Sequence, residues 1–186
     1  EYKNNKEDYI NLICDVMIPE ISKLKLAEFC DVFCENKYFN FDDSYKILKK
    51  AQKYGLIPRM HADEFEDSRG IELAVKLKAI SADHLMAANN KMFKKMADAG
   101  VISVLLPGTT FFLGQKNYVN ARELISNGCE VALATDFNPG SCSINSLPQI
   151  MFLAMNYCNM TFEEAFKGIT INAAKAINRE LELGLV

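Results

Sequence analysis

Five short apolar runs recur along this sequence, each separated from the next by a stretch with the periodicity of a helix. Successive runs start 22 to 29 residues apart and occupy Asp31–Cys34, Pro58–His61, Ile80–His84, Ile102–Leu106 and Val131–Thr135. A crossover between parallel strands needs about a dozen helical residues and two short loops, which this spacing provides. Antiparallel hairpins would bring the runs closer together. The sequence therefore predicts an α/β fold built from βα units.

The stretches between the runs carry signals for the start and end of helices. Asn40 can cap a helix that continues to Tyr54 and ends at Gly55. Gly100 and Gly128 close two further helical stretches in the same way.

Two more helices are expected near the ends of the chain. Thr161 and Glu164 form a capping-box pattern ahead of an apolar segment. Residues 7–25 are amphipathic with helical spacing, and Pro19 should kink or interrupt that helix.

Regular βα alternation leaves two architectures, an open doubly wound sheet or part of a closed barrel. A dinucleotide-binding open sheet would carry a glycine-rich turn after a strand, and neither G-x-G-x-x-G nor G-x-x-x-x-G-K-[ST] occurs. The chain also contains no low-complexity tract or flexible linker. We therefore expect a partial (β/α)8 TIM barrel with about five parallel strands, forming one domain over residues 1–186.

Composition excludes several classes of partner. The net charge is −3 with acidic and basic residues interspersed, so no basic stripe for nucleic acid exists. No apolar run approaches the roughly 20 residues that span a bilayer, and the N-terminus lacks the apolar core of a signal peptide. The six cysteines are scattered without a C-x-x-C pair. These features predict reduced, mostly structural thiols in a cytoplasmic protein.

The strongest functional signal is the position of three residues. The chain has two histidines, His61 and His84, and each falls at the carboxyl end of a predicted strand. Asp136 follows the last predicted strand in the same way. Because catalytic residues of parallel barrels gather at the carboxyl ends of the strands, the three residues predict a single site.

The chemistry of these groups suits metal-assisted hydrolysis. A neutral His61 can bind zinc or ferrous iron, and Glu64 three residues later can contact the water or the substrate. His84 could be a second ligand or could polarise a carbonyl, and Asp83 could orient it or be a plain loop acid. Asp136 can bind the metal and accept the proton of the attacking water. The alternatives are a histidine satisfied by backbone contacts and an aspartate that caps a turn.

Two loops complete the predicted rim. The loop Asn138–Ser141 offers backbone N–H groups and a hydroxyl to an anionic group. Thr109 and Thr110, after the fourth run, are expected to be packing and turn residues rather than catalysts.

Several of these motifs together resemble the imidazolonepropionases, a family of the amidohydrolase superfamily. The motifs are His-Ala-Asp-Glu-Phe at 61–65, Ser-Ala-Asp-His at 81–84, Leu-Leu-Pro-Gly-Thr at 105–109 and Ala-Thr-Asp-Phe-Asn-Pro-Gly at 134–140. Asp-Val-Phe-Cys-Glu at 31–35 and Thr-Ile-Asn-Ala-Ala at 170–174 also fit the family. The resemblance covers essentially the whole chain.

The resemblance implies a metal-dependent hydrolase barrel that opens 4-imidazolone-5-propanoate to N-formimidoyl-L-glutamate with zinc or iron. It implies that His61 and Asp136 bind the metal and that Glu64, His84 and Asp136 are catalytic. Glu64 would face the substrate and the activated water, and His84 the reacting carbonyl. The substrate propanoate or the product would be held by Asn138, Gly140 and Ser141.

The chain departs from the family at one important point. The family carries a His-x-His pair on its first barrel strand, and no such pair occurs here. The first three strands and the family's small β-sandwich are therefore expected to be missing. Because two ligands bind a metal far more weakly than four, we expect this chain alone to be inactive or nearly so.

Two other interpretations remain open at this stage. One is a different amidohydrolase, such as a nucleobase deaminase, which would use the same residues on an aminated ring. The other is a non-catalytic half barrel that pairs with itself as a homodimer to bury its strand edges.

Overall fold

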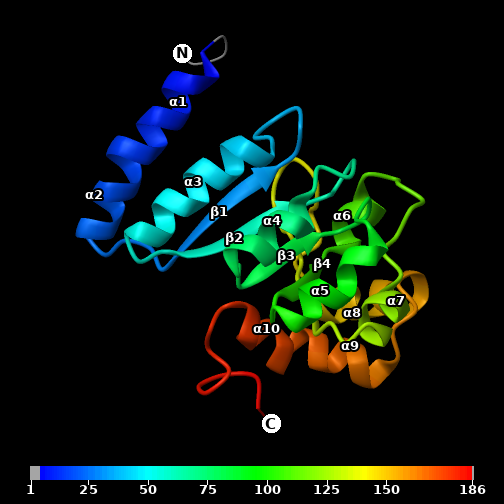
Figure 1. The fold of residues 1–186 in the computed structure, drawn as a ribbon. Coiled ribbons are helices and arrows are strands. Elements are labelled where there is room, and N and C mark those ends of the chain that lie inside the picture. The colour runs from blue at the N-terminus through cyan, green and yellow to red at the C-terminus, as the bar shows by residue number, and fades with distance from the viewer. Residues whose placement is uncertain (1–4, 186) are drawn as a thin grey trace.

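The computed structural model describes residues 5–185, which build one five-stranded parallel sheet with helices around it (Figure 1). Residues 1–4, where the sequence predicts no signal peptide, and residue 186 lie outside the described part. The strands pair in the order of the sequence: β1 Phe29–Cys34, β2 Ile57–Ala62, β3 Ser81–His84, β4 Ile102–Leu105 and β5 Val131–Leu133. All five predicted strands are confirmed, with shifts of one or two residues at their ends. The α/β fold with consecutive parallel strands is therefore confirmed as well.

Three helices cover the outer face of β1, β2 and β3, where most of the core lies. They are α3 Phe41–Lys53, α4 Gly70–Leu77 and α5 Phe93–Asp98, the last preceded by a 3-10 turn, η2 Asn90–Met92. Asn40 caps α3 with a full capping box, as the sequence predicts, and Gly55 follows the helix with a φ of 82°. Leu48, Met60 and Leu73 are fully buried between these helices and the sheet.

The remaining helices follow β4 and β5. They are α6 Pro107–Phe112, α7 Ala121–Ser126, α8 Leu147–Tyr157, α9 Phe162–Ile169 and α10 Ile171–Ala176. The predicted capping box of Thr161 and Glu164 is present at the start of α9. Asn172 at the start of α10 donates a hydrogen bond to the carbonyl of Val131, 2.8 Å away. This bond places α10 at the amino ends of the strands.

The N-terminal helix continues through Pro19. It consists of α1 Lys6–Leu12, a π-helical turn η1 Ile13–Met17 and α2 Ile18–Lys23, with helical dihedral angles at the junctions. Proline lacks an N–H and crowds the carbonyl four residues earlier, which here belongs to Asp15 in the π turn. A widened turn relieves that clash. The predicted disturbance is thus a π turn ahead of Pro19 rather than a break.

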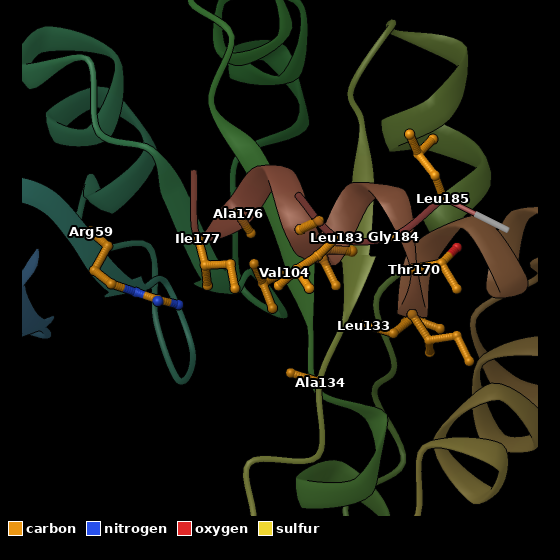
Figure 2. A pocket seen from close by; sticks show the side chains of 14 residues that line it. Arg59, Val104, Leu133, Ala134, Thr170, Ala176, Ile177, Leu183, Gly184 and Leu185 are labelled. Carbon is orange, nitrogen blue, oxygen red and sulfur yellow. The ribbon is translucent and has the colours of Figure 1, made fainter. Parts of the chain in front are cut away.

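A separate apolar cluster occupies the inner face of β4 and β5. Ala176 of α10 packs there against Ile102, Val104, Leu106 and Ala132. Beside it lies a cavity of about 520 Å³ between these strands, α10 and the C-terminal residues 183–185 (Figure 2). Arg59 is the one charged residue that lines this cavity. Apart from Arg59 and Thr170, this cavity is lined by apolar side chains and glycine.

Two further predictions concern membrane-spanning helices and the state of the cysteines. Among residues 5–185, no helix combines the length and apolar content required to cross a bilayer. All six cysteines carry free thiols, and five of them are buried.

Candidate metal centre and active site

The carboxyl ends of β2, β3 and β5 bring the predicted site residues together. The rings of His61 and His84 lie with their centroids 5.1 Å apart. Glu64, in the loop after β2, places its Oε1 atom 3.6 Å from Nδ1 of His84. Asp136, after β5, is close enough for its charge to act on both His61 and Glu64. One rim therefore holds all four groups.

His61 lies in a cluster of charged residues on the inner face of the sheet. Its Nδ1 atom is 3.1 Å from Oδ1 of Asp31 on β1. The potential ligand atoms of Asp31, His61 and Asp83 lie within 4.8 Å of one another, which makes them a candidate metal site. Arg59 reaches the same two carboxylates, with Nη2 3.0 Å from Oδ2 of Asp83 and Nε 3.8 Å from Oδ2 of Asp31.

Opposing effects set the protonation of this cluster. Burial disfavours a charged His61, yet the hydrogen bond that His61 donates to Asp31 and the charges of the nearby carboxylates outweigh it and raise the pKa of His61. Burial raises the pKa of Asp83, and the charge of Arg59 opposes that change. The guanidinium therefore already supplies positive charge to the two carboxylates.

Glu64 and His84 form the most strongly perturbed pair of the rim. Burial raises the pKa of Glu64 to about 7, with Asp136 and Glu35 adding to the effect. Burial, followed by the charge of His61, lowers the pKa of His84 to about 3. Nδ1 of His84 is buried without a hydrogen-bond partner among the described residues. Near neutral pH the site thus offers a carboxyl group that exchanges its proton beside an imidazole that stays neutral.

Asp136 is held by a residue that follows β4. Oγ1 of Thr109 donates a hydrogen bond of 2.6 Å to Oδ2 of Asp136. The sequence predicts that Thr109 and Thr110 are packing and turn residues, and both are buried in α6. The additional bond to Asp136 joins residues 27 positions apart, which local sequence patterns do not indicate.

The loop after Asp136 forms a closed turn. The backbone N–H groups of Gly140 and Ser141 both donate to Oδ1 of Asn138, each at 2.8 Å. Nδ2 of Asn138 donates to Oγ of Ser141 at 2.8 Å. The N–H groups that the sequence assigns to an anion are therefore satisfied within the loop, and an anion must compete with Asn138 for them.

Several residues at these strand ends adopt left-handed backbone conformations. Asp63, His84 and Asp136 have φ angles of 52°, 77° and 51°. The Asp63 carboxylate accepts hydrogen bonds from the N–H groups of Ser68, Gly70 and Ile71, which anchors the start of α4. A side chain at Gly70 would lie 2.7 Å from Cβ of Ala62, so this close approach of helix and strand requires glycine. Such conformations cost about 1–3 kcal/mol each and persist where surrounding contacts enforce them.

A sequence profile of the amidohydrolase family matches residues 38–186, and the chain belongs to this family. Its curated relatives include the imidazolonepropionase of Alkaliphilus oremlandii, 47% identical over 186 residues, which are all of this chain and 44% of that protein. The imidazolonepropionase of Geobacillus thermodenitrificans is 51% identical over 184 residues, 99% of this chain and 43% of that protein. The chain thus spans less than half the length of these relatives.

Solved structures agree with the fold. An adenosine deaminase from Xanthomonas campestris with bound zinc superposes with a TM-score of 0.72 and 14% sequence identity. The superposition covers 91% of this chain and 44% of that one. At this identity the likeness supports the fold alone.

Proposed function

We propose that this chain is the carboxyl-terminal part of the catalytic barrel of an imidazolonepropionase. The reaction would open the cyclic amide of 4-imidazolone-5-propanoate to N-formimidoyl-L-glutamate. The observation that carries the proposal is the identity of 47% and 51% to two imidazolonepropionases over almost all of this chain. The grouping of His61, Glu64, His84 and Asp136 at one rim supports it.

The donor atoms at the rim fit a divalent metal ion. His61 offers an imidazole nitrogen and Asp136 a carboxylate oxygen, a donor set that suits zinc or ferrous iron. When bound, the ion would polarise the amide carbonyl and acidify a water molecule. The two remaining ligands would come from a His-x-His pair outside this chain. With two ligands present, the 186-residue chain by itself should turn over substrate at a negligible rate.

The residues of this chain would then bind the substrate and move protons. Asp136, held by Thr109, would accept the proton of the attacking water. Glu64, whose pKa is about 7, would pass a proton to the leaving ring nitrogen. His84 has a pKa of about 3, so its imidazole is neutral near pH 7. The ring N–H of this neutral imidazole would donate a hydrogen bond to the carbonyl oxygen of the substrate.

The propanoate group would bind at the loop of Asn138, Gly140 and Ser141. In the closed turn, Asn138 occupies the two N–H groups that an anion would use. The substrate carboxylate would replace the amide oxygen of Asn138, because an ionised acceptor forms stronger hydrogen bonds than a neutral one. The proposal also includes a cytoplasmic location and permits a homodimer.

The decisive experiment is an assay of the whole protein that contains this chain. We expect turnover of imidazolonepropanoate and none of aminated purines or pyrimidines. The Asp136→Asn variant should lose about 10²- to 10⁴-fold in kcat, because it lacks the proton acceptor. Asp98→Asn, at an exposed helix position, is the matched control and should keep full activity. Ammonia release from an aminated base, or normal turnover by Asp136→Asn, would contradict the assignment.

A further inference from the structure

We propose that two carboxylates of the first strand region, Asp31 and Glu35, are positioning residues for the functional groups of β2. Asp31 fixes the tautomer of His61, and Glu35 fixes the backbone that carries Glu64. Neither residue is one of the four groups, His61, Glu64, His84 and Asp136, to which the proposed function assigns a role. The inference rests on the proposed function only in that His61 and Glu64 act there.

Glu35 joins the end of β1 to the loop after β2. Its side chain is buried, with 2% of the residue exposed. Oε1 accepts hydrogen bonds from the backbone N–H groups of Glu64, at 2.6 Å, and Phe65, at 3.0 Å. Oε2 accepts a bond of 3.0 Å from the hydroxyl of Ser68. A carboxylate that accepts three bonds in a buried place is firmly held, and so are its partners.

The contacts of Glu35 act on Glu64 through the backbone. Its bond is to the N–H of Glu64, while the carboxyl group of Glu64 points to His84, 3.6 Å away. The bonds to Glu64 and Phe65 therefore set where the Glu64 side chain begins. A displacement of about 1 Å at such a site can reduce a rate by about 10²-fold.

Asp31 acts on the ring of His61. A carboxylate only accepts hydrogen bonds, so the 3.1 Å contact requires the proton of neutral His61 to lie on Nδ1. Nε2 then keeps its lone pair and is the atom available to a metal. An imidazole without this partner would divide between two tautomers, one of which leaves Nε2 blocked by a proton.

Arg59 explains why this cluster positions His61 rather than binding a cation of its own. Its guanidinium lies 3.0 Å from Asp83 and 3.8 Å from Asp31. A second cation between these carboxylates would have to displace Arg59 or bear its repulsion. Arg59 lies on β2 two residues before His61 and on the same face of the strand. Its charge therefore attracts Asp31 to a position beside His61.

The test of Glu35 compares two conservative variants. Glu35→Gln retains an oxygen for the two backbone N–H groups, and its amide can donate to the hydroxyl of Ser68. Glu35→Asp retains the charge, but its side chain is one methylene shorter, so the carboxylate moves away from the two backbone N–H groups. If Glu35 positions Glu64, the Asp variant loses about 10²-fold in kcat in the whole protein and the Gln variant stays within a few fold. Hydrogen exchange of the Glu64 and Phe65 amides should accelerate in the Asp variant only.

Ser68→Ala is the matched control for Glu35. It removes one bond from the same buried carboxylate but leaves both bonds to the loop backbone. We expect a loss of stability with unchanged kcat and unchanged protection of the two amides. The reverse order, an active Asp variant and an inactive Gln variant, would overturn the positioning role in favour of a role for charge.

The test of Asp31 uses nitrogen NMR of the histidine rings at alkaline pH. In the whole protein, the signals of His61 are identified as those that the His61→Gln variant lacks. Wild type and Asp31→Asn, which can still accept the proton, should show His61 protonated on Nδ1. Asp31→Ala should move His61 toward the Nε2–H tautomer and weaken zinc binding of the whole protein by about 10- to 100-fold. Asp83→Asn, which alters the same cluster without a bond to His61, is the control and should leave the tautomer unchanged.

These measurements separate the two proposals. The tautomer and the amide exchange require no substrate, so they stand even if the whole protein does not open imidazolonepropanoate. A wild-type His61 protonated on Nε2 would overturn the role of Asp31 while leaving the proposed reaction untouched.

Discussion

The inner face of the sheet has two unlike halves. Across β1, β2 and β3 it carries Asp31, Arg59, His61 and Asp83, linked by ion pairs and hydrogen bonds. Across β4 and β5 it is apolar and is covered in part by α10. The boundary is abrupt, because Asp83 on β3 pairs in register with Val104 on β4.

The two halves of the sheet face are stabilised by different interactions. In the polar half the charged groups pair across neighbouring strands, and removal of Arg59 leaves the buried Asp83 carboxylate uncompensated. In the apolar half a side chain contributes mainly its volume. Substitutions of similar size should therefore have unequal effects in the two halves.

The largest effect is expected at Arg59. Arg59→Met preserves the aliphatic length but leaves the buried Asp83 carboxylate without its cation. We expect the free energy of unfolding to fall by about 3–5 kcal/mol in chemical denaturation. Lys94→Met, at the exposed pair with Asp98, should change it by less than about 1 kcal/mol. Adding Asp83→Asn to Arg59→Met should recover part of the loss, and no recovery would argue against a coupled pair.

A smaller, pH-dependent effect is expected from His84. Its pKa falls from 6.5 in the unfolded chain to about 3 in the fold, so below pH 6.5 only the unfolded state gains the proton. The stability linked to His84 is therefore complete above pH 6.5 and is lost as the pH falls toward 3. Between about pH 8 and pH 5 the free energy of unfolding of wild type should fall by about 2 kcal/mol relative to that of His84→Gln, at about 1.4 kcal/mol per pH unit below 6.5.

Glu64 contributes with the opposite sign, which sharpens the measurement. Its pKa rises from 4.5 to about 7, so its contribution is complete below pH 4.5 and is lost as the pH rises to about 7. Because Glu64 lies 3.6 Å from His84, the comparison of wild type with His84→Gln should be repeated in a Glu64→Gln background, in which the titration of Glu64 is absent from both proteins. Parallel pH profiles of the two proteins would show that His84 titrates normally in the fold.

The smallest effect is expected in the apolar half. Val104→Ala removes two methyl groups from a side chain that borders the open cavity of about 520 Å³. Little new enclosed space arises, so the loss should approach the transfer term of about 1.5 kcal/mol. A loss as large as that of Arg59→Met would remove the distinction between the halves.

Local sequence patterns predict some features of the fold and the candidate site, whereas others depend on strand register. The strands and helix ends follow from local periodicity and from single capping residues such as Asn40 and Thr161. His61, His84 and Asp136 were predicted because they end strands, and parallel strands end at one rim. Their assigned roles in catalysis remain predictions.

The residues that support the rim were not predicted. Asp31, Glu35 and Arg59 act through partners 24 to 30 residues away, and such pairs depend on strand register rather than on local pattern. One signal was available in the sequence. Arg59 precedes His61 by two positions, and alternation along a strand places both on the same face.

The left-handed backbone at Asp63, His84 and Asp136 has a consequence for protein engineering. Glycine relieves the strain of this conformation, but at Asp63 it would remove the carboxylate that anchors α4, and at His84 it would leave a buried cavity. Screens for heat resistance should therefore favour glycine at Asp136 rather than at the other two sites. Such a gain would delete the Asp136 carboxylate from the rim. Selection for thermal stability alone would therefore produce a more stable protein that lacks one of its predicted catalytic groups.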